Sequence, residues 1–256
     1  MDAVYRIEGS TARTSHLAAG PWDRTMQHGA APASLIAWAA ERIETPAPMR
    51  IARLTADLLR PVPIAPLDIK SEVVRQGRKI QLCAISLSAG GVEVARGSVL
   101  KIREQTADLP PDAAGPPLDL PEPEAGLATG SSSGDDFYAG MSARVVRGGF
   151  GAPGPAAIWF RVDRPIVEGQ PISAAMRAVV AADFCNGASA VLPFAEWTFM
   201  NADLTVSLAR PPVGDWVLLD AETWAGPAGS GLAFARLADR RGYFGRAIQS
   251  LVIEPR

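Results

Sequence analysis

LTADLLRP, residues 54–61, returns as LTVSLARP at residues 204–211, with Leu, Thr, Leu, Arg and Pro in register. A second match lies at the same offset, because ARG at residues 95–97 aligns with GRA at residues 245–247. Each of these tripeptides opens the last apolar run of its half of the chain. One matched octapeptide could arise by chance, but two matches at one offset favour duplication of an ancestral half.

Between the two repeats the chain loses its hydrophobic periodicity, from Glu104 to about Gly140. This stretch contains Pro110, Pro111, Pro116, Pro117, Pro121 and Pro123, followed by Ser131, Ser132, Ser133 and Gly134. Such a composition is typical of a linker. We therefore predict an N-terminal domain at residues 1–103, a linker rich in Pro, Gly and Ser at residues 104–140, and a C-terminal domain at residues 141–256.

The two domains share one order of predicted elements, a helix followed by an antiparallel meander, which is an α+β layout. In the first domain, hydrophobic spacing predicts a helix over 35–43 and strands over 54–59, 67–74, 80–87 and 92–102. In the second, it predicts a helix over 172–183 and strands over 199–208, 216–223, 231–237 and 244–253. The first helix is apolar nearly all round, so we expect the sheet to curl around it.

This layout resembles the double-hotdog thioesterases, in particular acyl-CoA thioesterase II and its thioesterase-like relatives, over nearly the whole chain except the linker. The resemblance rests on His28-Gly29 at the start of the first helix, on the repeated strand with Leu-Thr and Arg-Pro, and on a last strand that contains Gln249. It implies a tandem (double) hotdog, each half a curved antiparallel sheet wrapped around a central helix. It also implies an acyl-CoA thioesterase that hydrolyses an acyl-CoA thioester to free fatty acid and CoA, without a cofactor or a metal.

In that family an Asp, a Ser or Thr and a Gln of the second half position a water for attack on the thioester. By position these catalytic residues would be Asp183, Asn201 and Gln249. Asn201 departs from the family pattern, because an amide can hydrogen-bond the water or the thioester oxygen but cannot relay a proton as a hydroxyl can. We expect a polarising role for it.

Asp183 also has a physical argument of its own. It extends an apolar stripe with i, i+3, i+4 spacing, formed by Ile172, Ala175, Met176, Val179 and Val180, so it faces inward. In the last turn of the helix, burial and the helix dipole both disfavour its negative charge, and carboxylates in such positions mark functional sites. In the alternative interpretation, the helix has already ended and Asp183 opens a polar turn over residues 183–187.

Strand alternation gives the other two residues less support. Within residues 247–253 it turns Gln249 inward among apolar neighbours, where the amide could bind a water with Asp183 or be a satisfied structural glutamine. Within residues 199–206 it places Asn201 on the face opposite Leu204, away from the helix, unless a bulge or an interdomain groove lies there.

We predict that His28 and Gly29 bind substrate, because unpaired backbone N–H groups where a helix begins could hold a carbonyl oxygen or a pantetheine amide. His28 could also be a general base, but it belongs to the half that lacks a counterpart of Asp183, which favours a role in shaping the helix entry. Cys185 has no histidine nearby in sequence, which favours an inert buried thiol over a nucleophile. The chain has no Gly-x-Ser-x-Gly elbow, and the glycine-rich run at 148–151 lacks the lysine of a P-loop.

The composition excludes other classes of protein. The 256 residues are 48% hydrophobic and 20% charged, which excludes global disorder, and the net charge of −2 lacks the basic excess that nucleic-acid binding requires. Two cysteines and two histidines are too few and too scattered for a disulfide scaffold or a structural zinc site. With no apolar signal core and no apolar run long enough to span a membrane, we expect a soluble cytoplasmic protein.

The sequence leaves three candidate functions to compare. Hydrolysis of an acyl-CoA is the first, and its alternative is a non-catalytic protein that binds acyl-CoA or lipid, which the Asn201 substitution keeps open. Double-hotdog enoyl-CoA hydratases use an Asp and His pair, and no such pair is found in the second half, so hydration is disfavoured. Because hotdog sheets expose edge strands, we expect the domains to pair as a pseudo-dimer and the chain to form a homodimer or a higher homo-oligomer.

Overall fold

The computed structural model describes residues 2–110, 113–129 and 134–256, so Pro111 and Ser131–Ser133 of the predicted linker lie outside the described residues. The elements of the first half are β1 (Tyr5–Glu8), β2 (Thr11–Thr14), η1 (His16–Ala18), α1 (Ala30–Glu41), β3 (Met49–Leu58), β4 (Leu67–Gln76), β5 (Ile80–Ala89) and β6 (Val92–Arg103). Those that follow are η3 (Pro123–Ala125), β7 (Leu127–Thr129), η4 (Tyr138–Gly140), β8 (Met141–Arg147), β9 (Ala156–Val162), α2 (Ala174–Asp183), α3 (Cys185–Ala188), β10 (Trp197–Asn201), β11 (Asp203–Leu208), β12 (Trp216–Ala225), β13 (Ser230–Asp239) and β14 (Gly242–Pro255).

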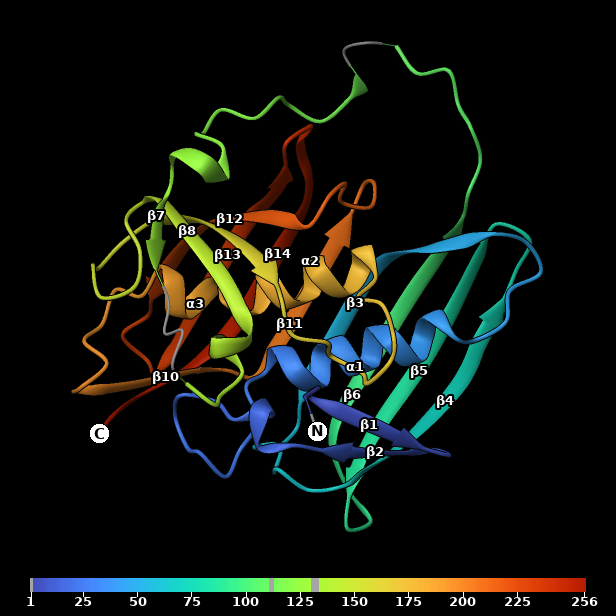
Figure 1. The fold of residues 1–256 in the computed structure, drawn as a ribbon, viewed down its shortest axis with the longest axis horizontal. Helices are drawn as coiled ribbons and strands as arrows, with labels where there is room; N and C mark the ends of the chain where they lie inside the picture. The colour runs from blue at the N-terminus through green and yellow to red at the C-terminus, as the bar shows by residue number, and fades with distance from the viewer. Residues whose placement is uncertain (1, 111–112, 130–133) are drawn as a thin grey trace.

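The strands form one continuous curved sheet in the order β1-β2-β4-β5-β6-β3-β11-β14-β13-β12-β9-β8-β7, and β10 pairs with β14. Figure 1 shows the two main helices on one side of this sheet, where α1 packs on β3 to β6 and α2 packs on strands of the second half. Each half is therefore a curved antiparallel sheet around a helix, and the predicted double hotdog fold is confirmed.

The two halves join through the repeated octapeptides themselves. Strand β3 pairs antiparallel with β11, and Thr55 lies opposite Thr205, its partner in the sequence repeat. The hydroxyl oxygens of these two threonines lie 3.0 Å apart. A residue that faces its own repeat partner marks a local twofold axis, so the duplicated halves pair as the predicted pseudo-dimer.

The two helices pack against each other in opposite directions. Asp183 at the end of α2 lies against His28 at the start of α1, while Arg42 at the end of α1 donates to Gln170 just before α2. Helix α1 is buried over residues 30–40, as expected from a helix that is apolar all round. No helix among the described residues is long and apolar enough to span a membrane.

Strands β1, β2, β8 and β9 were not expected from the sequence pattern. The first two are polar strands of four residues each, too short to show a period. Strand β9 is buried along residues 156–160, so it reads as a continuous apolar run without alternation. Hydrophobic periodicity does not identify a strand this short or a strand that is buried along its length.

Part of the segment between the halves packs against the second half (Figure 1). The indole of Trp159 donates to the Pro121 carbonyl at 2.8 Å, and Tyr243 N–H donates to the Pro116 carbonyl at 3.1 Å. Leu118 and Leu120 pack against the buried cluster that contains both of these aromatic residues. This part of the segment therefore packs on one end of the outer face of the sheet and does not extend into solvent.

Candidate active site

The five predicted site residues meet at the carboxylate of Asp183. Asp183 is the last residue of α2, and its side chain is 2% exposed, so it belongs to the helix and faces inward as the apolar stripe predicted. Ser173 caps the start of this helix by accepting a hydrogen bond from Met176 N–H at 3.1 Å. The helix is thus fixed at one end and delivers the carboxylate to the interior at the other.

Asn201 reaches this carboxylate because of a β-bulge. Its amide nitrogen donates to Asp183 Oδ1 at 3.0 Å. Asn201 pairs with Leu251 while Thr205 pairs with Ile248, so one strand has an extra residue between these two pairs. The extra residue reverses the alternation, and Asn201 shares the inner face with Leu204. Simple alternation is therefore wrong here, and the bulge that was left open is present.

Gln249 is fully buried on the inner face of β14, as alternation predicted. Its amide nitrogen donates to Asp183 Oδ1 at 3.3 Å and to the Asp183 carbonyl at 3.2 Å. Its oxygen accepts from the backbone N–H of Asn186 at 3.1 Å. The amide is therefore satisfied and also touches the carboxylate directly, with no gap between the two side chains for a water.

His28 and Gly29 enter the same cluster from the other half. The Nδ1 atom of His28 lies 3.0 Å from Asp183 Oδ2. Gly29 caps α1, and a Cβ built on it would lie 2.9 Å from both carboxylate oxygens. Its φ of −55° suits any residue, so the close approach of the carboxylate, and not the backbone, requires glycine here.

The expectation that His28 shapes the helix entry did not include this contact between the halves. Sequence reasoning found no Asp and His pair in the second half, and the structure forms one across the two halves. The two residues lie 155 positions apart in the chain, and only the opposite directions of α1 and α2 bring them together.

His28 makes two contacts through its Nδ1 atom. The backbone N–H of Ala30 donates to Nδ1 at 3.2 Å, so His28 pairs one of the amides at the start of its own helix. The same nitrogen lies 3.0 Å from Asp183 Oδ2. The side chain of His28 therefore lies between the start of α1 and the carboxylate of the other half.

The two helices act oppositely on the charge of Asp183. Its own helix presents carbonyl groups at this end, which disfavour an anion, as expected from the sequence. The start of α1 lies against the same carboxylate at Gly29, and the positive end of the α1 dipole favours an anion there. The buried carboxylate thus has a compensating dipole that comes from the other half of the chain.

Sequence reasoning missed three residues around this cluster. Asn186 orders Gln249 through its backbone and donates from its side chain to the Phe199 carbonyl at 2.9 Å. Phe137 and Phe184 pack against the His28 ring, with centroids 5.2 and 4.6 Å away. The polar turn after Asp183 could have indicated Asn186, but nothing in the segment between the domains indicated Phe137. Burial raises the pKa of the neighbouring Cys185 thiol, which fits an inert cysteine.

The equivalent position of the first half lacks these groups. By the offset of the repeat, Ile51 and Val99 stand where the second half has Asn201 and Gln249. A cavity of about 250 Å³ lies there, between Glu41 and the start of α2. Lys101 lines it and donates to the Ile43 carbonyl at 3.0 Å, so it caps the end of α1. The cluster of a carboxylate with two amides is therefore specific to the second half.

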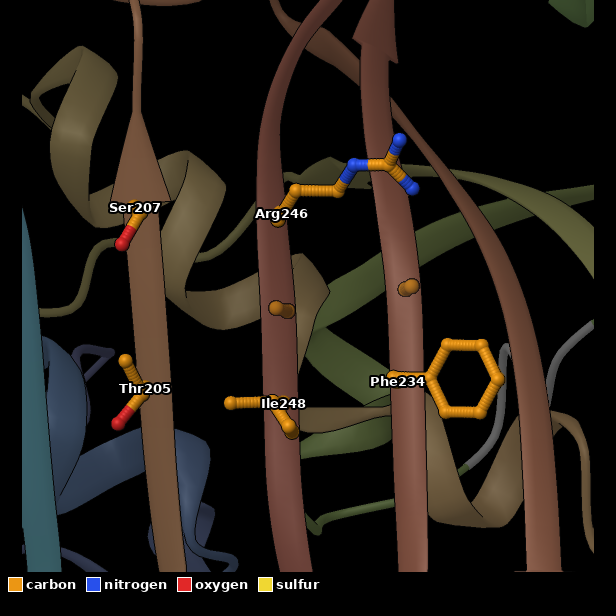
Figure 2. A pocket seen from close by; sticks show the side chains of 7 residues that line it. Thr205, Ser207, Phe234, Arg246 and Ile248 are labelled. Atoms are coloured by element: carbon orange, nitrogen blue, oxygen red, sulfur yellow. The ribbon is translucent and has the colours of Figure 1, made fainter.

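A hollow of about 310 Å³ lies away from both positions, on the outer face of the sheet across β11, β13 and β14. Figure 2 shows its lining side chains, among them Thr205, Phe234 and Ile248, projecting from these strands. It lies on the face opposite the helices, because Asp183 and Gln249 occupy the inner face. The lining of the hollow has no titratable residue except Arg246.

Family models identify the chain. The acyl-CoA thioesterase N-terminal domain matches residues 18–102, and the acyl-CoA thioesterase C-terminal domain matches residues 110–253. The chain belongs to the acyl-CoA thioesterase family. A comparison with curated proteins finds no match. The C-terminal match begins within the segment predicted as a linker, and that segment packs on the second half in the structure.

Solved structures agree on the fold of this acyl-CoA thioesterase family member. A hot dog fold protein from Alicyclobacillus acidocaldarius has a TM-score of 0.76 at 14% identity, covering 99% of this chain and 97% of its own. An acyl-CoA thioesterase II from Mycobacterium marinum has a TM-score of 0.69 at 17% identity, covering 98% and 94%. A tesB protein from Mycobacterium avium subs. paratuberculosis has a TM-score of 0.71 at 15% identity, covering 98% and 95%.

Proposed function

We propose that this protein hydrolyses an acyl-CoA thioester to a free fatty acid and CoA at the Asp183 cluster. One observation carries the proposal. The buried carboxylate of Asp183 contacts Asn201 and His28 at 3.0 Å and Gln249 at 3.3 Å, where the start of α1 meets the end of α2. A carboxylate, a histidine and a backbone N–H at the start of a helix are groups that hydrolysis by an activated water uses.

Each of these residues has the role in the reaction that suits its chemistry. Asp183 carries the charge that activates the water, while Asn201 and Gln249 hold that carboxylate and polarise the reacting groups. The N–H group of Gly29 can donate to the thioester oxygen, because it lies at the start of a helix and negative charge develops on that oxygen. His28, Gly29 and Asn201 are partly exposed, so the substrate approaches from their side.

Two alternatives are tested with the same protein. A non-catalytic acyl-CoA-binding or lipid-binding protein is favoured by Asn201, which cannot relay a proton. Hydration of an enoyl-CoA is favoured by the His28–Asp183 contact, which supplies the acid and base pair that sequence reasoning did not find. Family membership favours hydrolysis over both.

The experiment measures CoA release from short-, medium- and long-chain acyl-CoAs with a thiol reagent. We expect release by the wild type and by Asp215→Asn, a control on a mostly exposed aspartate, and a loss of at least about 100-fold for Asp183→Asn. Thermal melting with acyl-CoA present shows binding without turnover, and absorbance of an enoyl-CoA shows hydration. Binding without CoA release would support the non-catalytic protein, and equal rates for Asp183→Asn and wild type would refute this site.

The remaining parts of the proposal concern the whole chain. We keep the domain boundaries at 1–103 and 141–256 with the joining segment 104–140. Cys83 and Cys185 are both buried and unpaired, which suits a reducing compartment, and we propose a cytoplasmic location. The hollow outer face (Figure 2) carries exposed apolar residues such as Ile248, which suits association into a homodimer or a higher homo-oligomer.

A further inference from the structure

We propose that the cavity of the first half is a second ligand site, which binds the carboxylate of a short aliphatic acid. The cavity has a volume of about 250 Å³, and it lies at the position that corresponds to the Asp183 cluster of the second half. Lys101 and Arg50 are the cations in its wall. A carboxylic acid is also a product of the proposed hydrolysis, but binding at this cavity does not depend on that reaction.

Lys101 brings a buried positive charge to the wall of the cavity. It is 2% exposed, and its ammonium group donates to the Ile43 carbonyl at 3.0 Å. An ammonium group has three N–H donors, so this cap of α1 uses one of them. Lys101 forms no ion pair with a carboxylate in the part of the chain that the structure describes. Burial of the charge lowers the pKa of Lys101, and an anion in the cavity would act as its counter-ion.

Arg50 adds a second cation from β3, the strand that pairs with the strand of Lys101. One of its terminal nitrogens donates to the Ala209 carbonyl at 3.0 Å. Its Nε atom is buried and has no hydrogen-bond partner among the described residues. Buried polar groups in native proteins are nearly always hydrogen-bonded, so such a donor calls for an explanation, and binding of an anion is one.

The start of α2 is a third feature that favours an anion. Ala174 and Ala175 are the first two residues of this helix, and both line the cavity. The hydroxyl oxygen of Ser173 accepts from the N–H of Met176, so its hydrogen bond leaves the first two N–H groups of the helix unpaired. The positive end of the α2 dipole therefore adds to the charges of the two cations.

Comparison of the two halves shows that this chemistry is specific to the first. At the offset of the repeat, Lys101 corresponds to Leu251 and Arg50 to Met200. The start of α1 lies against the buried carboxylate of Asp183. The acid at the end of α1 is Glu41, which is exposed. The chain thus supplies a buried anion at the start of α1, whereas the start of α2 meets two cations and an open volume.

The rest of the wall indicates the class of ligand. Apolar side chains line much of it: Ile43, Met49, Ile51 and Leu208. They favour a hydrocarbon chain over a fully hydrated ion. A volume of about 250 Å³ is below the range of about 300–1,000 Å³ typical of sites for drug-sized ligands, so the chain is short. Glu41 and Glu104 are exposed residues of the wall, and their charges disfavour a dianion more than a monoanion.

The test is calorimetric titration of the full chain with hexanoate, hexan-1-ol and inorganic phosphate. We expect hexanoate to bind and the other two to bind at least about tenfold more weakly, because the alcohol lacks the charge and phosphate lacks the chain. Lys101→Met and Arg50→Met should each weaken hexanoate binding at least about tenfold, the effect of losing a hydrogen bond to a charged group. Lys101→Met also removes the cap of α1, and Arg50→Met leaves that cap in place.

Two control variants separate this cavity from the rest of the protein. Lys70→Met, at an exposed lysine of β4, should bind hexanoate like the wild type. Asp183→Asn should also keep hexanoate binding, because the cavity lies in the other half.

Three results would overturn the inference. They are no hexanoate binding by the wild type, phosphate binding as tight as that of hexanoate, and hexanoate binding that is lost in Asp183→Asn but kept in Lys101→Met and Arg50→Met. Failure of the wild type to release CoA would overturn the proposed function and leave this site standing if hexanoate binds as expected.

Discussion

Gly29→Ala tests how tightly the start of α1 is fitted to the carboxylate of Asp183. The added methyl carbon would lie 2.9 Å from both carboxylate oxygens, whereas ordinary contacts of this kind are 3.4–4 Å long. The helix start and the carboxylate must therefore separate by roughly 0.5 Å, because a close-packed interior has no free volume for the added methyl group. Backbone strain contributes nothing, because the φ of Gly29 is −55°.

That displacement falls on contacts that are already near their limits. The His28 and Asn201 contacts to the carboxylate are 3.0 Å long and the Gln249 contact is 3.3 Å. A shift of about 0.5 Å brings them close to the length at which a hydrogen bond is lost. Misplacement by about 1 Å can cost a hundredfold in rate, so we expect kcat to fall by about ten- to a hundredfold.

The assay is CoA release followed with a thiol reagent, together with the melting temperature. Gly187→Ala is the matched control, because a Cβ at Gly187 in α3 has nothing within 4 Å. We expect the control to keep the wild-type rate. Gly29→Ala should remain folded, with at most about 1–2 kcal/mol lost from the helix cap. If Gly29→Ala retained the wild-type kcat and KM, the position of this carboxylate would not limit the reaction.

Three further predictions concern stability and reactivity. Burial alone would raise the pKa of Asp239, but hydrogen bonds from Arg210 and two backbone amides lower it. The carboxylate therefore stabilises the fold above the unfolded pKa of about 3.9, and this stabilisation is lost as pH falls through the lower folded pKa. Urea unfolding of Asp239→Asn should show that the free energy of unfolding falls by about 3–5 kcal/mol near neutral pH and by less below about pH 4, whereas a loss independent of pH would contradict the ion pair. The Thr55–Thr205 hydrogen bond of 3.0 Å should give a coupling free energy of about 0.5–1.5 kcal/mol in a double-mutant cycle with valine, and strictly additive variants would argue against it. Iodoacetamide at about pH 8 should leave CoA release unchanged, because burial raises the pKa of the Cys185 thiol, whereas rapid inactivation would show an accessible thiolate.

Local patterns predicted the scaffold well. The repeat at one offset identified the two strands that join the halves, because a duplicated domain that pairs with itself places the same strand on the shared axis. Helical spacing predicted that Asp183 faces inward and strand alternation predicted the same for Gln249, and both residues are buried. These predictions succeed because each period is set by backbone geometry within a single element. The expected strands were also found, with ends that moved by a few residues.

The arrangement of the site depended on contacts that no local period contains. A single extra residue after Asn201 reversed the alternation of its strand, and the sequence pattern of β10 and β11 does not mark where that bulge falls. The segment between the domains looked like a plain linker, yet its Phe137 packs against His28.

The sequence by itself determined a duplicated hotdog with an inward carboxylate at the end of its second helix. Only the tertiary structure decided that this carboxylate meets His28 and the start of the first helix. Residues 28 and 183 are brought together by the pairing of β3 with β11 and the opposite directions of the two helices. Periodicity within one element indicates which face a side chain occupies. The residue that this side chain contacts is set only when the two halves pack together.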